Sequence, residues 1–464
     1  MPLEVVILAA GQGSRMKSDQ PKVLHGIAGK PLVEHVIDAA LKIEPGHIHI
    51  VYGHKGEHVR QKLSTIPAAD RLTYSEQAEQ LGTGHAVAQA LPRLNEVADD
   101  ASQVLILYGD VPLIAADTLR NFVAASAGKL GILTVTLDNS SGYGRILRND
   151  SHEIIGIVEE KDASPAQKTI KEVNTGIMCC SLDRLNQWLP KLSSNNAQGE
   201  YYLTDIVALA VADGVPVGSG EAASAMEVEG VNNRLQLAAL ERQFQRKEAD
   251  RLMTEGCTLA DPARVDVRGS VRTGRDCFAD INVVFEGNVV LGDRVSIGPN
   301  CVLRDCTIGA DTEILAFSTV ESSKVGSRAV IGPYARLRPG CELASDTKIG
   351  NFVEVKKSVI GEGSKVNHLS YVGDSEIGKG VNVGAGTITC NYDGVNKFKT
   401  VLGDNVFIGS NTALVAPVTV GANATVGAGS VITHDVEADS LAVARGKQKK
   451  IDGWKRPAKK KPNT

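Results

Sequence analysis

The second half of the chain repeats a unit of six residues, and a branched aliphatic residue leads most of the units. Between residues 291 and 432 these positions fall six or five residues apart, as in Leu291, Ile297 and Leu303. An amphipathic helix would need apolar residues three or four apart, and a β-sandwich would need alternation between closely spaced turns. Hexads are typical of a parallel β-helix, in which three units form one coil of about 18 residues.

The first 230 residues have a different pattern, in which buried strands alternate with amphipathic helices. We expect strands at 4–10, 47–52 and 103–108 and helices at 30–43, 84–91 and 117–127. This alternation indicates an α/β domain with a mostly parallel sheet, whose ligands usually lie at the carboxyl ends of the strands. Apolar residues at helical spacing then predict a helical arm over 233–255, and a short irregular stretch at 261–280 leads into the coils.

Stacked coils bring residues about 18 apart onto one wall. Arg338 and Lys356 each follow an inward aliphatic residue, so we expect them side by side, where two cations about 5 Å apart repel by roughly 3 kcal/mol at an effective dielectric near 20. A phosphate between them would reverse that cost, although both side chains could also splay into water. Arg336 and Glu354 share the same spacing and are expected to form an ion pair.

The hexads stop between Val383 and Leu402, where we expect a loop over residues 389–400 to leave the β-helix. Loops on rigid scaffolds often carry function, and this loop offers Asn391, Tyr392 and Lys397.

Composition and charge narrow the range of functions. The chain has 464 residues and a net charge of −4, which gives no general attraction to nucleic acid. Its lysine-rich end at 446–464 is interpreted as a solvated tail. Eight cysteines without metal spacing suit reduced thiols in the cytoplasm. Neither a signal peptide nor a membrane span is expected.

A glycine-rich segment ends the first strand. Gly11 and Gly13 allow backbone N–H groups to approach a phosphate chain, and Arg15 and Lys22 add positive charge. The spacing fits neither the dinucleotide fingerprint nor a P-loop. The whole string Leu-Ala-Ala-Gly-Gln-Gly-Ser-Arg-Met over 8–16, followed by Pro-Lys, resembles the signature of the sugar-nucleotidyltransferases.

Further segments extend this resemblance in chain order. It implies a Rossmann-like domain with Mg²⁺ held by Asp110 and Asn232, and with Arg15 and Lys22 as catalytic residues. A Gly-Asp pair after a strand is more often a plain turn, and Asn232 could instead cap the next helix. The resemblance also implies contacts to UTP and the sugar from Leu8, Ala9, Ala10, Gly11, Lys22, Gln77, Gly82, Thr83, Tyr108, Gly109, Asp110, Gly144, Glu159, Asn174 and Asn232.

Taken together, the signature, the helical arm and the hexads resemble the bacterial bifunctional N-acetylglucosamine-1-phosphate uridyltransferases and glucosamine-1-phosphate acetyltransferases. The resemblance implies a uridyltransferase domain at 1–231, a linker at 232–255, a left-handed β-helix acetyltransferase domain at 256–445 and a tail at 446–464. It also implies a homotrimer formed through the β-helix.

The same resemblance assigns residues in the second half of the chain. His368 is implied as the base, because an amino sugar is largely protonated near neutral pH and histidine titrates there. Glu354 is a candidate to orient its imidazole, unless it pairs with Arg336. Arg338, Lys356, Tyr371, Asn382, Asn391 and Tyr392 are implied for glucosamine 1-phosphate, and Ala385, Ser410, Ala428 and Arg445 for acetyl-CoA.

Two other functions remain open at this point. One is a nucleotidyltransferase with a single activity, related to ADP-glucose pyrophosphorylase, whose coils serve regulation. The other is a non-enzymatic subunit of a nucleotide-exchange factor. His368 and its loop disfavour the first, and the presence of Arg15, Lys22 and Asp110 disfavours the second.

Overall fold

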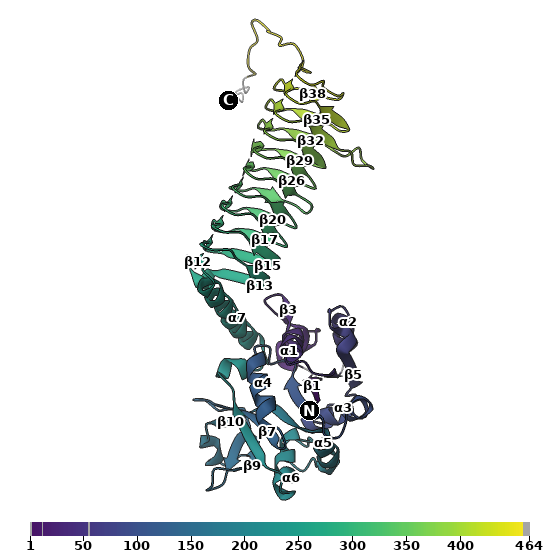
Figure 1. Cartoon of the computed structure of the whole chain (residues 1–464), viewed down its shortest axis with the longest axis vertical. Helices are drawn as coiled ribbons and strands as arrows, with labels where there is room; N and C mark the ends of the chain where they lie inside the picture. The colour runs from purple at the N-terminus through teal and green to yellow at the C-terminus, as the bar shows by residue number, and fades with distance from the viewer. Residues whose placement is uncertain (1, 12, 54–55, 458–464) are drawn as a thin grey trace, which may run out of the picture. The chain divides into compact units, whose positions relative to one another are not determined.

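The computed structural model describes residues 2–11, 13–53 and 56–457, and it divides the chain into two compact units (Figure 1). They are Met1–Lys247 and Glu248–Thr464, and the division falls within helix α7 (Arg234–Thr254). The lysines at 459–461 of the predicted tail lie outside the described residues. Among the helices that the structure describes, none is both long and apolar enough to cross a bilayer.

The first unit is built on one mostly parallel sheet. Strand β10 is antiparallel to both of its neighbours, and β8 (Arg145–Arg148) and β9 (Ile154–Val158) extend the sheet beside it. The spatial order is β11 (Val217–Glu221), β7 (Leu130–Thr136), β10 (Glu172–Ser181), β6 (Gln103–Tyr108), β1 (Leu3–Ala9), β4 (Ile48–Tyr52) and β5 (Leu72–Glu76).

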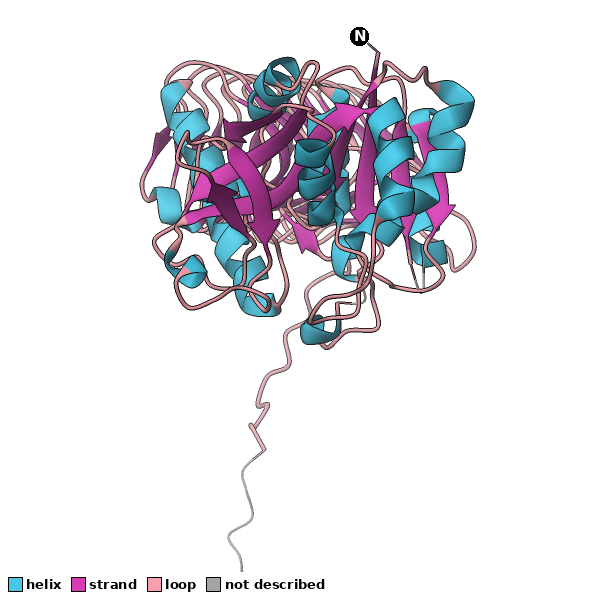
Figure 2. Ribbon diagram, turned by 90° about the horizontal axis from the view of Figure 1, so that it is seen from below, coloured by secondary structure: helices cyan, strands magenta, loops and turns pink. Residues whose placement is uncertain are grey.

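Helices cover both faces of this sheet (Figure 2). Alternate residues of β1 enter different cores: Val5 and Ile7 pack with helices α1 (Leu32–Leu41), α2 (Gly56–Leu63) and α4 (Ala116–Ala125). Val6 and Leu8 pack with α3 (Thr83–Val97), α5 (Leu182–Trp188) and α6 (Ile206–Ala212) on the other face. Because β1 is buried on both sides, its sequence is a nearly continuous apolar run, and this run allowed the strand to be predicted.

The predicted elements of this unit are confirmed, with shifts at their ends. The strand at 103–108 has the expected bounds, whereas the helix expected at 84–91 continues to Val97. The helical arm expected at 233–255 is α7.

The second unit is a left-handed parallel β-helix, whose rungs are labelled along its axis in Figure 1. One wall consists of β12 (Thr258–Leu259), β14 (Phe278–Ala279), β16 (Ser296–Ile297), β19 (Glu313–Ile314), β22 (Val330–Ile331), β25 (Lys348–Asn351), β28 (Lys365–His368), β31 (Asn382–Val383), β34 (Phe407–Ile408), β37 (Thr425–Val426) and β39 (Leu441–Ala442).

The other strands of this unit join in a 17-stranded sheet, in which the long strand β15 pairs with both β17 and β18. They are β13 (Val265–Arg272), β15 (Val283–Leu291), β17 (Val302–Arg304), β18 (Thr307–Ile308), β20 (Thr319–Glu321), β21 (Lys324–Val325), β23 (Arg336–Leu337), β24 (Glu342–Leu343), β26 (Glu354–Lys356), β27 (Val359–Ile360), β29 (Tyr371–Gly373), β30 (Ser375–Ile377), β32 (Ile388–Cys390), β33 (Thr400–Leu402), β35 (Ala413–Val415), β36 (Val418–Val420) and β38 (Val431–Ile432).

Two rows of side chains fill the interior of the β-helix. The aliphatic row predicted from the hexads is buried, and a second row lies two positions before it, as Cys341 precedes Leu343 and Ser370 precedes Val372. Many members of the second row are Ser, Thr, Ala or Cys. Most of their hydroxyls bond backbone carbonyls, as Ser364 Oγ does to the Gly378 oxygen at 2.7 Å, whereas the buried Thr400 hydroxyl has no partner among the residues that the structure describes.

The irregular stretch predicted at 261–280 is wrong. Strand β13 already occupies 265–272, and Val265, Val271 and Cys277 are buried six residues apart. The hexads therefore begin more than one coil before Leu291, and the aliphatic pattern hid them because Thr273 and Ala279 interrupt the row there. The predicted loop is present between β32 and β33, where an isolated bridge joins Tyr392 to Lys397.

Seven of the eight cysteines are buried, and we expect them to resist labelling in the native protein. Burial raises the pKa of Cys179, Cys257 and Cys306 to about 12, which lowers their thiolate fraction at pH 8 about a thousandfold. Titration with a disulfide reagent should show one fast thiol, the half-buried Cys390.

The Cys390→Ser variant should lose the fast phase, and all remaining thiols should react after unfolding in guanidinium. Rapid reaction of the seven buried thiols in the native protein would mean that the cores of both units open readily.

Candidate functional sites

The carboxyl edge of the first sheet gathers the predicted phosphate and metal residues. Asp110 follows β6, and its carboxylate forms an ion pair with the Lys22 ammonium. Lys22 Nζ also donates to Asn232 Oδ1 at 3.3 Å, and Arg15 Nη2 donates to the same oxygen at 2.9 Å. Two side-chain oxygens from distant segments therefore converge on one ammonium group.

Gly13 allows this arrangement for two reasons. Its φ of +62° is a left-handed conformation, and a Cβ there would lie 2.7 Å from Lys22 Cβ. A side chain at position 13 would thus push Lys22 away from Asp110.

The alternative role of Asn232 as a helix cap is wrong. The residue that caps α7 is Asn233, whose Oδ1 accepts from the Gln236 N–H at 2.9 Å. The side chain of Asn232 therefore stays with Arg15 and Lys22, while its backbone N–H donates to Gln236 Oε1.

A cavity of about 270 Å³ adjoins this cluster. Ala9 lies in a neighbouring hollow, together with Gly11 and Ser14. Gln77 is buried in the wall, where its Nε2 donates to the Gly82 carbonyl at 3.0 Å. Nine of the residues predicted for UTP line the cavity: Leu8, Ala10, Gly11, Lys22, Gln77, Gly82, Thr83, Tyr108 and Asp110.

The predicted sugar residues lie near the ends of β8, β9 and β10. Burial raises the pKa of the Glu159 carboxyl, although Thr204 Oγ1 donates to it at 3.1 Å. A Cβ on Gly144 would lie 3.3 Å from that carboxylate. Asn174 Oδ1 accepts from the Gly176 N–H at 3.0 Å, and Gly109 is packed closely against Ala9.

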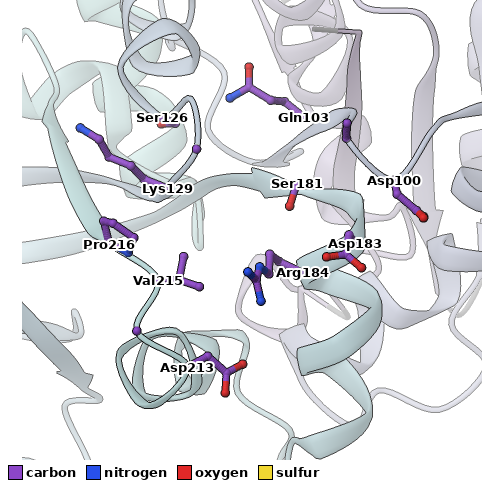
Figure 3. Close-up of a pocket in the computed structure, with 13 residues that line it drawn as sticks. Asp100, Gln103, Ser126, Lys129, Ser181, Asp183, Arg184, Asp213, Val215 and Pro216 are labelled. Carbon is purple, nitrogen blue, oxygen red and sulfur yellow. The ribbon is translucent and has the colours of Figure 1, made fainter.

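A second cavity, of about 590 Å³, lies at the opposite edge of the same sheet (Figure 3). It is lined by residues at the amino ends of parallel strands, such as Gln103 of β6, and by Lys129 and Arg184. None of the site residues predicted from the sequence lines this cavity. The predicted residues therefore lie at the carboxyl edge of the sheet, and the larger cavity lies at the amino edge.

In the β-helix, Arg338 and Lys356 lie on neighbouring coils, as predicted. Leu337 pairs with Val355, and the Arg338 N–H donates to the Val355 carbonyl at 2.8 Å. Glu354 pairs with Arg338 at 2.9 Å and lies 3.9 Å from Arg336, so the predicted ion pair with Arg336 is confirmed.

A third cation comes from the loop. The neighbouring Lys356 ammonium lowers the pKa of Lys397, which indicates that the two amines lie close together. The sequence singled out Lys397 but contained no signal for where the loop would carry it.

His368 is oriented by Asn351 rather than by Glu354. Its Nδ1 lies 2.7 Å from Asn351 Oδ1, and the two residues pair across neighbouring coils. Because an amide oxygen only accepts, the imidazole donates from Nδ1 and keeps Nε2 as its basic nitrogen. The sequence analysis missed Asn351, although its spacing of 17 from His368 is one coil.

Tyr371, Asn391 and Gly373 form a second group next to Lys356, which pairs with Gly373. A Cβ on Gly373 would lie 2.4 Å from the Tyr371 hydroxyl and 2.9 Å from Asn391 Nδ2, so glycine leaves the space that both polar groups occupy. Asn391 also donates to Asp374, and the Tyr392 hydroxyl donates within its loop to the Gly394 carbonyl.

The residues predicted for acetyl-CoA form a column that starts at His368. The Gly386 N–H donates to the His368 carbonyl at 3.3 Å, and the Asn411 N–H donates to the Ala385 carbonyl at 2.7 Å. The Ser410 carbonyl accepts from the next coil at 2.8 Å, and Arg445 Nη1 donates to the Ala428 carbonyl. Asn382 lies in β31, which pairs with the strand of His368.

Comparisons with known proteins agree with both units. Residues 5–153 match the MobA-like NTP transferase domain, and residues 270–305 and 399–434 match the bacterial transferase hexapeptide family. A solved structure of UDP-glucose pyrophosphorylase complexed with UDP-glucose covers 53% of this chain and 100% of that chain at 16% identity. Its TM-score of 0.45 is too low to support an inference.

Two curated relatives match nearly the whole chain, and both are named Bifunctional protein GlmU. The relative from Marinobacter nauticus is 60% identical and covers 99% of both chains. The relative from Idiomarina loihiensis is 57% identical over 99% of this chain and 100% of its own. Neither the ADP-glucose pyrophosphorylase alternative nor the exchange-factor alternative accounts for such matches. The chain therefore belongs to the GlmU family, the bifunctional uridyltransferases and acetyltransferases of UDP-N-acetylglucosamine synthesis.

Proposed function

We propose that the two activities are divided between the two units of the fold. Residues 1–231 transfer the uridylyl group of UTP to N-acetylglucosamine 1-phosphate, and residues 256–445 first acetylate glucosamine 1-phosphate with acetyl-CoA. Residues 232–255 link them. The observation that carries the proposal is that His368, Arg338 and Lys356 all belong to the β-helix, with His368 on one wall and the two cations on another, whereas Asp110, Lys22 and Asn232 meet at a sheet edge in a separate core.

Uridylyl transfer needs no general base, because the attacking sugar phosphate is already an anion. Arg15 and Lys22 neutralise the charge that the nucleotide brings, and backbone N–H groups of the glycine segment bind its phosphates. Gln77 and the 270 Å³ cavity accept the base, while Glu159 and Asn174 bind the sugar.

Mg²⁺ fits the Asp110 and Asn232 pair. Their oxygens converge on the Lys22 ammonium, a position that already suits a cation. Two protein ligands are typical of Mg²⁺, which keeps waters and substrate phosphates as its other ligands. Within the described residues no group of three or more His, Cys, Asp or Glu could hold a metal, which suits an ion shared with a nucleotide. When bound, the ion stabilises negative charge on the phosphates.

In the acetyltransferase site, His368 takes a proton from the sugar amine through Nε2. Asn351 holds the ring by its Nδ1–H, so the basic nitrogen is available for the substrate. Arg338, Lys356 and Lys397 bind the sugar phosphate, and Tyr371, Asn382, Asn391 and Tyr392 contact the sugar. The free amine then attacks the thioester carbonyl of acetyl-CoA, which extends along Ala385, Ser410, Ala428 and Arg445. The amide C–N bond forms as the C–S bond breaks, and CoA leaves as a thiol with the proton that His368 took up.

Single substitutions should separate the activities. His368→Ala should reduce acetyl transfer by a factor of about 10² to 10⁴ and spare uridylyl transfer, because the general base is lost. Asp110→Ala should reduce uridylyl transfer about a hundredfold or more and spare acetylation. Both rates are measured on each purified variant.

A folded variant that lost both activities would disprove the division of labour. Asn232→Ala keeps Asp110 intact and should raise the Mg²⁺ concentration that gives half-maximal uridylyl transfer.

Gly373→Ala should impair sugar binding. The new Cβ would displace the Tyr371 hydroxyl, which would lie only 2.4 Å away, so the KM for glucosamine 1-phosphate should rise about tenfold. Gly156→Ala is the matched control, because its Cβ would meet only Leu147 at 3.8 Å. An unchanged KM in Gly373→Ala would show that Tyr371 and Asn391 do not contribute to sugar binding.

We infer further that the β-helix forms a homotrimer and that the acetyl site is completed by a second copy. His368 is exposed on one chain, and Leu369 beside it is 63% exposed, whereas acyl transfer requires a site shielded from water. Phe317, Tyr334 and Phe352 stack on successive coils with ring centroids 4.9 and 5.3 Å apart, and each stays about half exposed. Such an aromatic ladder is typical of an interaction surface.

Replacing the middle ring tests the trimer. Tyr334→Ser should lower the mass found by light scattering and reduce acetyl transfer, while uridylyl transfer persists. Leu235→Ser, which changes an 83% exposed side chain on α7, should leave the mass unchanged. A wild-type monomer with full acetyltransferase activity would contradict the trimer.

A further inference from the structure

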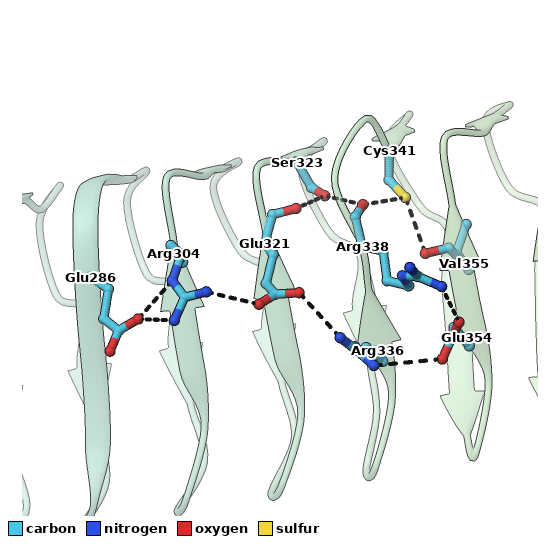
Figure 4. A network of polar contacts seen from close by, with 9 residues as sticks. All are labelled: Glu286, Arg304, Glu321, Ser323, Arg336, Arg338, Cys341, Glu354 and Val355. Atoms are coloured by element: carbon cyan, nitrogen blue, oxygen red, sulfur yellow. Dashed lines mark hydrogen bonds and ion pairs between the residues drawn. The ribbon is translucent and has the colours of Figure 1, made fainter.

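A row of alternating charges runs along one wall of the β-helix (Figure 4). Arg268, Glu286, Arg304 and Glu321 occupy the same outward position in successive coils. Arg304 Nε lies 2.6 Å from Glu286 Oε2, and its Nη1 lies 3.1 Å from Glu321 Oε1. Opposite charges that face each other across neighbouring strands stabilise the stack.

The alternation fails over the next two coils. Val320 pairs with Leu337, and Leu337 pairs with Val355, so the residues that follow Glu321 in the row are Arg338 and Lys356. Two cations succeed each other without a carboxylate between them. An anionic substrate at this place would restore the alternation.

Two carboxylates could nevertheless neutralise Arg338. Glu354 Oε1 already accepts from Arg338 Nη1 at 2.9 Å, and Glu321 precedes Arg338 in the row. A guanidinium that is fully paired with carboxylates has little net charge left for a phosphate.

Arg336 contacts both of these carboxylates. Its Nη2 lies 3.6 Å from Glu321 Oε2, and its Nη1 lies 3.9 Å from Glu354 Oε2. Arg304 uses the other oxygen of Glu321, and Arg338 uses the other oxygen of Glu354. Arg336 therefore approaches the one oxygen of each carboxylate that is still available. Glu321 and Glu354 are only 17% and 34% exposed, so water screens these contacts incompletely.

The backbone of Arg338 is fixed independently of this network. Its carbonyl accepts from Ser323 Oγ at 3.2 Å and from the Cys341 thiol at 2.9 Å (Figure 4). Because the backbone of Arg338 is fixed, the neighbouring charges decide how available its guanidinium is to a ligand.

We propose that Arg336 is a positioning residue for the acetyltransferase, one that restrains Glu321 and shares Glu354 so that the Arg338 guanidinium remains available to the sugar phosphate. Arg336 binds no substrate itself. This role of Arg336 rests on the proposed function, in which Arg338 binds the sugar phosphate.

The test is the steady-state kinetics of Arg336→Gln in the full-length protein. Glu354 would then pair with Arg338 alone, so the KM for glucosamine 1-phosphate should rise about threefold to tenfold, as expected for the loss of partly exposed ion pairs. The kcat of acetylation should change less than twofold, and uridylyl transfer should stay unchanged. Arg336→Lys should recover most of the lost affinity.

Two matched variants make the test specific. Arg304→Gln removes one positive charge from the same row and leaves Arg336 on both carboxylates, so the KM should change less than twofold. Adding Glu354→Gln to Arg336→Gln removes the competing carboxylate and should bring the KM back toward the wild-type value.

Three results would overturn the proposal: an Arg336→Gln KM within twofold of the wild type, an equal rise in Arg304→Gln, or no recovery in the double variant. Arg338→Gln separates this from the underlying function. If that variant also binds glucosamine 1-phosphate normally, the phosphate site itself is wrong, whereas a large rise in its KM leaves only the role of Arg336 in question.

Discussion

The backbone hydrogen bonds between successive coils are the constraint on which the β-helix and its candidate site depend. Each coil must present its strands in register with the next, so residues 17 or 18 apart are fixed as neighbours. The register makes His368 the partner of Asn351 and sets Lys356 beside Arg338. The loop between β32 and β33 adds Asn391, Tyr392 and Lys397 to the candidate residues that this register aligns.

The two inward rows explain why this register is rigid. Aliphatic side chains fill the centre, and small side chains two positions earlier let the chain turn while their hydroxyls bond the carbonyls of the turns. The same row supports the site directly, because Ser323 and Cys341 hold the carbonyl of Arg338. The small residues that pack the interior thus also fix the backbone of a candidate phosphate-binding residue.

The α/β unit brings its candidate residues together in a different way. Parallel strands direct their carboxyl ends to one edge, where Asp110 after β6 meets Lys22 from the segment after β1. Asn232 joins them because Asn233, and not Asn232, caps α7. In both halves, therefore, a regular backbone brings together charged groups that lie far apart in the chain.

The sequence by itself determined the β-helix, the α/β sheet and the family, because hexads, buried strands and the glycine motif are local patterns. It missed the coil at 261–280, where Thr273 and Ala279 interrupt the row of branched aliphatic residues. Only the tertiary structure decided that Asn351 holds His368 and that Glu354 divides its oxygens between Arg336 and Arg338. The spacing of residues along the chain predicts which side chains lie on neighbouring coils. Which of two nearby partners a side chain contacts depends on its rotamer and on the neighbouring charges.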